Sequence, residues 1–530
     1  MAKYLIKRIL RGIVSIIIVV AVVMVLVYTF IDRSQIFSSD SVYLKQSNNQ
    51  KITYEYKKWE EYGYLDYIPY ADYLTELTTA GELDEETRAK AVAIGRSPEK
   101  DSEVAAEYVA KFTEKYAAMG YTVERLPVVT VSKNSNKLAK GGNQALFAYK
   151  DKPLISRLWT YLTGIIKVEN IYNAEGIPDE ERGISFTWYD PVYQKEDGEK
   201  VFSPAIIGNG TTHKYLLYFD KSFPYLHQNL VRINLGISYA VNSGIDIVDT
   251  MTRSQGMIAP KTVTFPTGLT EETADDLHTA TYVEGSLALS EVYQQRYLDD
   301  YTNVYAAKSG LSKVAYSFII GIIAVIVAYL LGVPIGILMA QKKDKFVDKL
   351  GTLYIIFIIA VPSLAYIFMF RAIGESIGLP ITFKVDTTSK LIYILPMISL
   401  ALPSVAGLMK WLRRYMIDQM NSDYVRFARS NGLSEGEIFS KHILKNAAIP
   451  IIHGIPGDIL FALVGAIITE RVYTVPGAGG LLTDAINVYD NGVIVGMTLF
   501  YAALSVLAII FGDILMSMVD PRISFSTKGR

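Results

Sequence analysis

An acidic residue stands inside an apolar stretch, residues 447–469, that is long enough to cross a membrane. Asp458 follows Pro456-Gly457 in this stretch. A carboxylate inside a bilayer is costly unless it faces water or a partner, so Asp458 is a candidate functional residue that lines a path across the membrane. In the alternative interpretation, the Pro-Gly pair breaks the helix and Asp458 caps its continuation. The sequence leaves both interpretations open.

A second acidic residue, Glu470, ends this stretch beside Arg471. The segment that follows reads Val475-Pro476-Gly477-Ala478-Gly479-Gly480. Its glycines and proline exclude a regular helix, so we expect the chain to turn back here and to dip at the mouth of the path. An ordinary interfacial ion pair of Glu470 with Arg471 is the alternative to a role of Glu470 in that path.

The residue patterns of common enzymes are missing from the sequence. It has no G-x-x-x-x-G-K-[ST] phosphate loop, no H-E-x-x-H pair and no G-x-S-x-G elbow. It also has no cysteine, which excludes disulfides, thiol catalysis and cysteine-based metal sites. We therefore expect no catalytic residue, no metal site and no cofactor bound by this chain.

Six apolar runs are long enough to cross a membrane as helices. They are residues 12–31, 314–340, 351–370, 391–409, 447–469 and 492–512. Only basic residues flank the start of the first run and no small-residue cleavage site follows it, so we interpret it as an uncleaved span rather than a signal peptide. Pro334 is expected to kink the second span near its inner end.

The charges predict the orientation of these spans. Segments assigned to the cytoplasm carry eighteen basic residues and the short outer loops carry four, which places both termini and residues 410–450 inside. Residues 32–308 are then extracellular. They contain 29 basic and 39 acidic residues, and an acidic outer part beside a basic membrane part fits this orientation. Nucleic-acid binding has little support, because no long basic run with interleaved aromatic residues occurs.

Residues 32–308 are predicted to form a folded α+β domain. Ser102 is a candidate N-cap for a helix that ends at Met119-Gly120, by the usual start and stop signals. Residues 284–305 are predicted to be helical, and Asp197-Gly198 to form a turn. Strands are predicted at residues 121–131, 184–193 and 214–219. The predicted domains are residues 1–31 (N-terminus and first span), 32–308 (outer domain) and 309–530 (spans two to six).

The polar segment 410–450, between the fourth and fifth spans, is predicted to contain two short capped helices. Ser422 is a candidate N-cap for a helix through Ser430, which Asn431-Gly432 ends with a left-handed residue. Ser434 and Glu437 have the spacing of a capping box that opens the second helix. Such an amphipathic hairpin suits docking onto a soluble partner, and a solvated interfacial loop is the alternative.

The same segment resembles a known motif. The residues that carry the resemblance are Arg426-Phe427-Ala428-Arg429-Ser430-Asn431-Gly432-Leu433, Lys441-His442 and Asn446-Ala447-Ala448-Ile449-Pro450. They are similar to the "EAA" loop of ABC-importer permeases, in the form of the oligopeptide and dipeptide branch. The resemblance implies a coupling helix that seats in a groove of a separate ATPase. The residues implied to couple are Arg426, Ala428, Gly432, Leu433, Ser434, Glu435, Glu437, Phe439 and His442.

The resemblance extends over the membrane part. Similar family motifs occur at Val333-Pro334-Ile335-Gly336, Val361-Pro362-Ser363, residues 474–480 and Asp520-Pro521-Arg522-Ile523. Glu470 matches a family acid, which implies an outer gate, and Pro476, Gly477 and Gly479 belong to the same motif. Asp513 also matches, and it is expected to be a helix-packing or interfacial residue near the inner end of its span.

Two features depart from the family. The family usually has no acidic residue at the position of Asp458, where the carboxylate of this chain could attract the amino terminus of a peptide. Most of residues 32–308 is extra, as in the Ami-type permeases of Gram-positive bacteria. This acidic, tyrosine-rich domain is expected to seat a binding protein or to shield the entry.

The implied fold is an all-α six-span membrane domain of the type I ABC importer permease, with the α+β domain inserted between spans one and two. The implied function is that of a permease subunit of an ATP-driven, binding-protein-dependent oligopeptide importer in a bacterial cytoplasmic membrane. The implied partners are a second permease, two cytoplasmic ATPases that bind ATP and Mg²⁺, and a lipid-anchored peptide-binding protein outside. The alternatives are a signalling or mechanotransmission protein with an outer sensor domain and a surface hydrolase. Nickel, dipeptide and sugar cargo also remain open.

Overall fold

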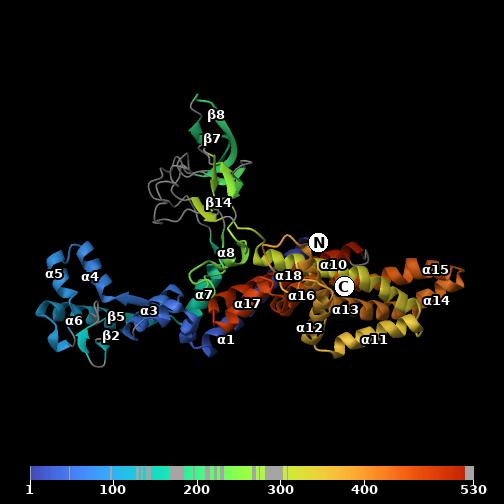
Figure 1. Ribbon diagram of the computed structural model, residues 1–530, viewed down its shortest axis with the longest axis horizontal. Coiled ribbons are helices and arrows are strands. Elements are labelled where there is room, and N and C mark those ends of the chain that lie inside the picture. The colour runs from blue at the N-terminus through green and yellow to red at the C-terminus, as the bar shows by residue number, and fades with distance from the viewer. Residues whose placement is uncertain are drawn as a thin grey trace.

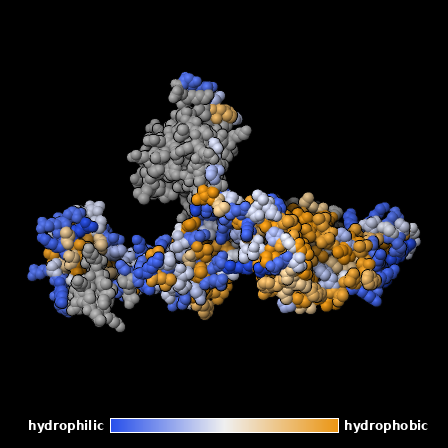
Figure 2. Space-filling view, viewed as in Figure 1, coloured by the Kyte–Doolittle hydropathy of each residue, from blue (hydrophilic) through white to orange (hydrophobic). Residues whose placement is uncertain are grey.

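A computed structural model describes residues 2–46, 48–95, 98–126, 130–132, 135–138, 145–167, 184–194, 197–208, 215–219, 224–226, 232–258, 260–264, 270–273, 275–280, 302–306 and 308–519. The long helices lie together, one outer unit with α3 to α6 extends along the long axis, and a second with β7, β8 and β14 projects to the side (Figure 1). Apolar residues gather over the long helices, and hydrophilic residues cover both ends of the long axis (Figure 2).

Five helices among the described residues are long and apolar enough to span a membrane. They are α1 (Ala2–Phe30), α10 (Lys313–Gln341), α13 (Ile394–Met420), α16 (Lys445–Tyr473) and α18 (Asn491–Val519). They correspond to the first, second, fourth, fifth and sixth predicted runs. α10 is continuous through Pro334, and α13 continues to Met420, beyond its predicted end.

The third predicted run is not a straight helix. It is divided between α11 (Phe346–Ala360) and α12 (Ser363–Ser376), which meet at an angle of 111°. Val361 between them is extended, because a residue before proline avoids the helical conformation. The described residues therefore contain five candidate spans, or six if this bent pair counts as one.

Small residues allow the long helices to pack closely. A Cβ on Gly332 of α10 would lie 2.9 Å from the Cβ of Leu408 in α13, so the close contact of these helices requires glycine there. At the other side of the bundle α1 lies along α18. Asp513 of α18 accepts a hydrogen bond from the Tyr4 hydroxyl at 2.9 Å and pairs with Nε of Arg8 at 2.9 Å. These contacts give Asp513 the packing role that we expect from its position.

The first outer unit is an antiparallel sheet flanked by helices. The strand order is β1-β5-β2, with β1 at Leu65–Pro69, β5 at Leu146–Asp151 and β2 at Thr122–Arg125. The helices are α2 (Ser41–Leu44), α3 (Asn48–Glu61), α4 (Tyr70–Thr79), α5 (Glu85–Ala91) and α6 (Glu103–Ala118). Ser102 caps α6 by accepting a hydrogen bond from the backbone N–H of Ala105 at 3.1 Å, and Gly120 follows α6 with φ +79°. Both predicted ends of this helix are therefore confirmed.

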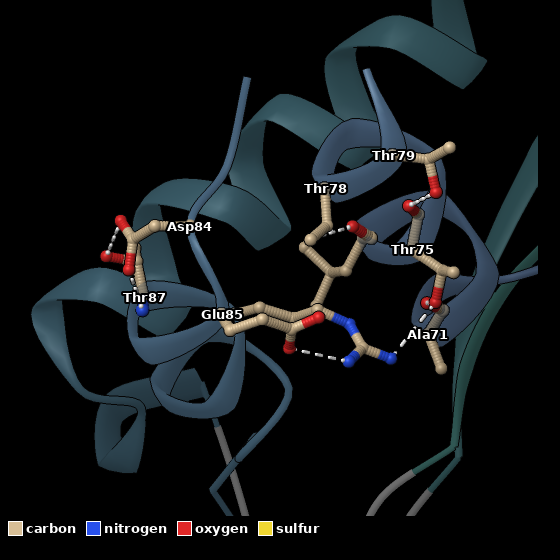
Figure 3. A network of polar contacts seen from close by, with 9 residues as sticks. Ala71, Thr75, Thr78, Thr79, Asp84, Glu85 and Thr87 are labelled. Carbon is tan, nitrogen blue, oxygen red and sulfur yellow. Dashed lines mark hydrogen bonds and ion pairs between the residues drawn. The ribbon is translucent and has the colours of Figure 1, made fainter. Parts of the chain in front are cut away.

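Two charged groups tie the pieces of this unit together. Arg125 at the end of β2 donates two hydrogen bonds of 2.7 Å to the buried carboxylate of Asp101. These bonds hold the pKa of Asp101 below its usual value. Arg88 of α5 donates to Glu85 at 3.0 Å and to the Thr75 hydroxyl of α4 at 3.1 Å, which joins the two helices (Figure 3).

A buried carboxylate joins the outer part to the spans. Asp490, just before α18, accepts hydrogen bonds from the backbone N–H groups of residues 239–241, each at 2.9 Å, and from the Ser238 hydroxyl at 2.6 Å. Tyr62 of the first outer unit stacks on Tyr239 with ring centroids 4.0 Å apart. The first outer unit is therefore fixed to the start of α18.

The second outer unit consists of antiparallel hairpins. Its largest sheet has the order β10-β9-β8-β7, with β7 at Ile184–Gln194, β8 at Lys200–Gly208, β9 at Tyr215–Phe219 and β10 at Pro224–Leu226. Gly198 has φ +80° in the predicted turn between β7 and β8. The predicted helix 284–305 is wrong at its end, which is a strand, β15 (Thr302–Ala306) paired with β14 (Asp275–Ala280). The rest of that prediction lies outside the described residues.

The remaining short elements connect these parts. Three helices are α7 (Leu154–Thr163), α8 (Ile247–Thr252) and α17 (Ala478–Asn487). Three strand pairs are β3 (Thr130–Ser132) with β4 (Ser135–Leu138), β6 (Ile166–Lys167) with β11 (Arg232–Ile233), and β12 (Lys261–Thr264) with β13 (Thr270–Thr273). The motif at residues 520–523 lies outside the described residues.

Candidate functional site

The segment between α13 and α16 contains the two helices that the sequence predicts, and we name residues 423–444 the double-helix segment. Its first helix is α14 (Asp423–Ser430), after which Gly432 has φ +79°. Ser434 then forms a complete capping box with Glu437. The second helix starts as α15 (Glu435–Glu437) and continues as a π-helical stretch, η6 (Ile438–Leu444), into α16. The predicted second helix and the fifth span are therefore one continuous helix, Glu435–Tyr473.

One side of the double-helix segment is anchored in the protein. Its buried residues pack against Leu412 and Met416 of α13, and they are Val425, Ala428, Ile438 and Ile443. Leu433 and Phe439 are partly buried against the same cluster. Among the residues predicted to couple to an ATPase, these two and Ala428 thus hold the segment in its own fold.

The other side of the segment is polar and open to solvent. An ion pair of 2.6 Å between Arg429 and Glu435 links the two helices, and hydrophilic residues cover α14 and α15 in Figure 2. The predicted coupling residues on this side are Arg426, Gly432, Ser434, Glu435 and Glu437. His442 is partly buried, with its ring 6.5 Å from the ring of Tyr424.

Phe427 is a residue of this surface that the coupling residues predicted from the sequence do not include. Its side chain is 69% exposed on an otherwise polar surface. The signal is present in the sequence, because Val425 and Ala428 are three residues apart and face the core, which leaves Phe427 on the outward side of α14. Aromatic residues are enriched at protein interfaces, so Phe427 is a candidate contact residue.

Asp458 lies in an unbroken helix. α16 continues through Pro450 and Pro456, so the interpretation in which Asp458 caps a new helix is wrong. Its carboxylate instead accepts a 2.6 Å hydrogen bond from the Tyr329 hydroxyl of α10. Asp458 also lines a cavity of about 420 Å³ between α13 and α16. A role of Asp458 in a path across the membrane stays a prediction.

Glu470 is buried at the other end of α16, with 1% of its surface exposed. It accepts hydrogen bonds from the Ser317 hydroxyl of α10 at 2.5 Å and from the backbone N–H of Gly480 at 2.9 Å. A negative charge is favourable at the start of a helix such as α17. A Cβ on Gly477 would lie 2.2 Å from the Glu470 carboxyl carbon, and one on Gly479 would lie 3.0 Å from Oε2. These two glycines therefore make room for the carboxylate.

One alternative and one expectation about this segment are wrong. Arg471 forms its ion pair with Asp484 of α17 rather than with Glu470. The segment after α16 is irregular only from Thr474, which has φ +56°, to Gly477, because Ala478 already begins α17. The glycines of α17 pack closely without interrupting it.

The predicted pathway residues form two separate sites. Glu470, Gly477 and Gly479 meet around one carboxylate, with Pro476 in the intervening turn. Asp458 lies twelve residues earlier on the same helix, about 18 Å away along its axis. Within the described part of the chain, no group of three His, Asp or Glu side chains could hold a metal ion.

Comparison with known proteins shows the family. The family described as "Binding-protein-dependent transport system inner membrane component" matches residues 332–525. The oligopeptide transport system permease protein AmiC of Streptococcus pneumoniae serotype 4 is 32% identical over 542 residues, with 100% of both chains covered. The chain belongs to the binding-protein-dependent permease family.

Other proteins match a smaller part of this permease. The dipeptide transport system permease protein DppB of Bacillus subtilis is 28% identical over 214 residues, which are 40% of this permease and 69% of DppB. A solved amino acid ABC transporter covers 40% of this permease and 92% of its own chain at 17% identity and a TM-score of 0.31, too low to support an argument. The similarity to AmiC, in contrast, includes residues 32–308.

The family defines what this permease is. It is a membrane subunit of an ABC transporter, and the ATPase of such a system is a separate subunit, so the permease is not an enzyme. The alternative interpretations as a signalling protein or a surface hydrolase have no support among these relatives.

Proposed function

We propose that this permease forms half of the translocation pathway of an ATP-driven oligopeptide importer. The observation that carries the proposal is the full-length similarity to a protein named as an oligopeptide permease. The cavity beside Asp458 supports it, because a path for cargo requires polar groups and space within the spans. The second half of the pathway comes from a second, non-identical permease subunit.

The double-helix segment is the contact site for an ATPase. Two observations support this assignment. The side around Ala428 and Ile438 is anchored in the protein, and the side around Arg426 and Phe427 is exposed. Because the second helix continues into α16, a movement of the segment reaches the spans directly. Two ATPases bind ATP and Mg²⁺ on the cytoplasmic side of the two permeases. As the ATPases close and separate, the pathway opens in turn to the outside and to the cytoplasm.

The topology has six spans, with the bent pair α11–α12 as the third. The excess of basic residues at the termini and in residues 410–450 supports a cytoplasmic position of these segments. Residues 32–308 then face the outside of a bacterial cytoplasmic membrane as an inserted α+β domain. This domain receives a lipid-anchored peptide-binding protein. The stacking of Tyr62 on Tyr239, whose backbone N–H donates to Asp490 just before α18, supports a platform of fixed position.

Single cysteines test this proposal, because the natural chain has none. In intact cells, a membrane-impermeant maleimide should label Lys90→Cys in α5 and should label Lys441→Cys only after permeabilisation. The intact transporter should also purify with two ATPases and should import labelled oligopeptides. Labelling of Lys441→Cys from outside, or purified transporter without an ATPase, would refute the proposal.

A further inference from the structure

Two stripes of residues face each other across the cavity between α13 and α16. On α13 the stripe includes Ser404, Gly407 and Trp411, and on α16 it includes Gly454 and Asp458. Residues three or four apart lie on one face of a helix, so each stripe is a continuous wall. The small residues Ser404 and Gly407 of α13 and Gly454 of α16 line this space of about 420 Å³.

The carboxylate of Asp458 is the acidic group in this wall. It accepts a hydrogen bond from the Tyr329 hydroxyl at 2.6 Å, whereas an ionised carboxylate can accept about four. A Cβ on Gly454 would lie 3.9 Å from Oδ2 of Asp458, so a side chain there would stand in front of this oxygen. Glycine at 454 therefore keeps the carboxylate accessible from the cavity.

Aromatic residues also belong to the lining of the cavity. Trp411, Tyr415 and Phe461 line the cavity together with Asp458. Aromatic faces and a carboxylate both attract a cation. Lys410 and Arg414 lie 5.6 and 5.5 Å from the ring centre of Trp411, so the end of the cavity near Trp411 is already positive. A further cation is therefore attracted to the other end, where Asp458 lies.

We infer that Asp458 forms a subsite for a positively charged amino group of the cargo, most simply the amino terminus of a peptide. This inference rests on the proposed function and assigns one end of the cargo to one place in the pathway. The hydroxyl of Tyr329 positions the carboxylate, and Gly454 leaves room for the ammonium group. The positive end of the cavity near Trp411 repels the same group, which gives the cargo a direction.

A cysteine inside the cavity tests the inference without relying on transport. The complete transporter carries Ser404→Cys as its single cysteine. The measured quantity is the ratio of two rates of modification of this cysteine, the rate with the cationic aminoethyl methanethiosulfonate over the rate with the anionic sulfonatoethyl methanethiosulfonate. One carboxylate at this range should raise that ratio, and Asp458→Asn should lower it about tenfold. Asp418→Asn, at the exposed end of α13 and outside the cavity, is the matched control and should leave the ratio unchanged.

Peptides identify the ligand in the same assay. Tetra-alanine should slow the modification of Ser404→Cys, N-acetyl-tetra-alanine should slow it much less, and Asp458→Asn should remove the difference. An N-acetylated peptide with one lysine distinguishes the amino terminus from a side-chain amine. An unchanged ratio in Asp458→Asn, or equal effects of the free and acetylated peptides, would overturn the inference. If uptake of oligopeptides persists in that case, the proposed function stands and only the subsite is wrong.

Discussion

Replacing Phe427 by alanine should separate the permease from its ATPase without unfolding it. The side chain is 69% exposed, so its removal costs the isolated chain little. An aromatic side chain has about 200 Å² of surface. If the exposed part is buried in a groove, its apolar contribution at about 25 cal/mol per Å² amounts to roughly 3 kcal/mol. That is a weakening of ATPase binding by about a hundredfold.

The assay is the retention of the ATPase by the purified transporter during dilution, together with the thermal unfolding midpoint of the permease. Phe346→Ala is the matched control, because Phe346 at the start of α11 is 77% exposed and lies outside the double-helix segment. Phe427→Ala should lose the ATPase while its unfolding midpoint stays within a degree or so of the parent, since exposed substitutions change stability by less than about 0.5 kcal/mol. Equal ATPase retention in both variants would refute the assignment of Phe427 to the contact surface.

Substitutions at three other positions address the remaining features. Gly432 has φ +79°, and a Cβ added there would have no neighbouring atom within 4 Å, so Gly432→Val should cost about 1–2 kcal/mol of backbone strain. We expect Gly432→Val to uncouple ATP hydrolysis from uptake and Gly432→Asn to retain coupling. Equal uptake in the two variants would contradict this. Asp490→Ala leaves buried N–H groups without an acceptor and should destabilise the permease by at least about 3 kcal/mol, measured by thermal unfolding, with Asp490→Asn less affected. Arg125 holds the pKa of Asp101 below the usual 3.8. The ion pair of Asp101 with Arg125 therefore stabilises the first outer unit fully above pH 3.8. This stabilisation is lost as the pH falls through the lower pKa that Asp101 has in the folded protein. Resistance of the first outer unit to pepsin in the full-length permease should fall in that range, and Asp101→Asn should abolish this pH dependence.

The sequence predicts well those features that depend on neighbours in the chain. The capping box of Ser434 and Glu437, the cap of α6 at Ser102 and the left-handed Gly432 all follow from residues less than five positions apart. The long apolar runs likewise predict the candidate spans, because a helix of this length is enough to cross the hydrocarbon core of a bilayer. The described residues within 32–308 contain both helices and strands, as the helix and strand signals predict.

The predictions fail where distant residues decide the outcome. The Pro456-Gly457 pair suggests a break in α16, but α10 and α13 pack beside this helix and it continues. The sequence offers Arg471 as the neighbour of Glu470, yet the hydrogen bonds of Glu470 come from Ser317, more than 150 positions away, and from Gly480. No local pattern encodes these contacts, since each needs two helices to be placed side by side first.

The continuous helix from Glu435 to Tyr473 has a mechanical consequence. At 1.5 Å per residue it is a rod of about 58 Å, and it carries the capping box near one end and the buried Glu470 near the other. A displacement of one end must therefore arrive at the other as translation or rotation, unless the π-helical stretch Ile438–Leu444 yields. One inserted residue between these ends would turn them by about 100° relative to each other. The two ends of the proposed pathway would then no longer open and close in step.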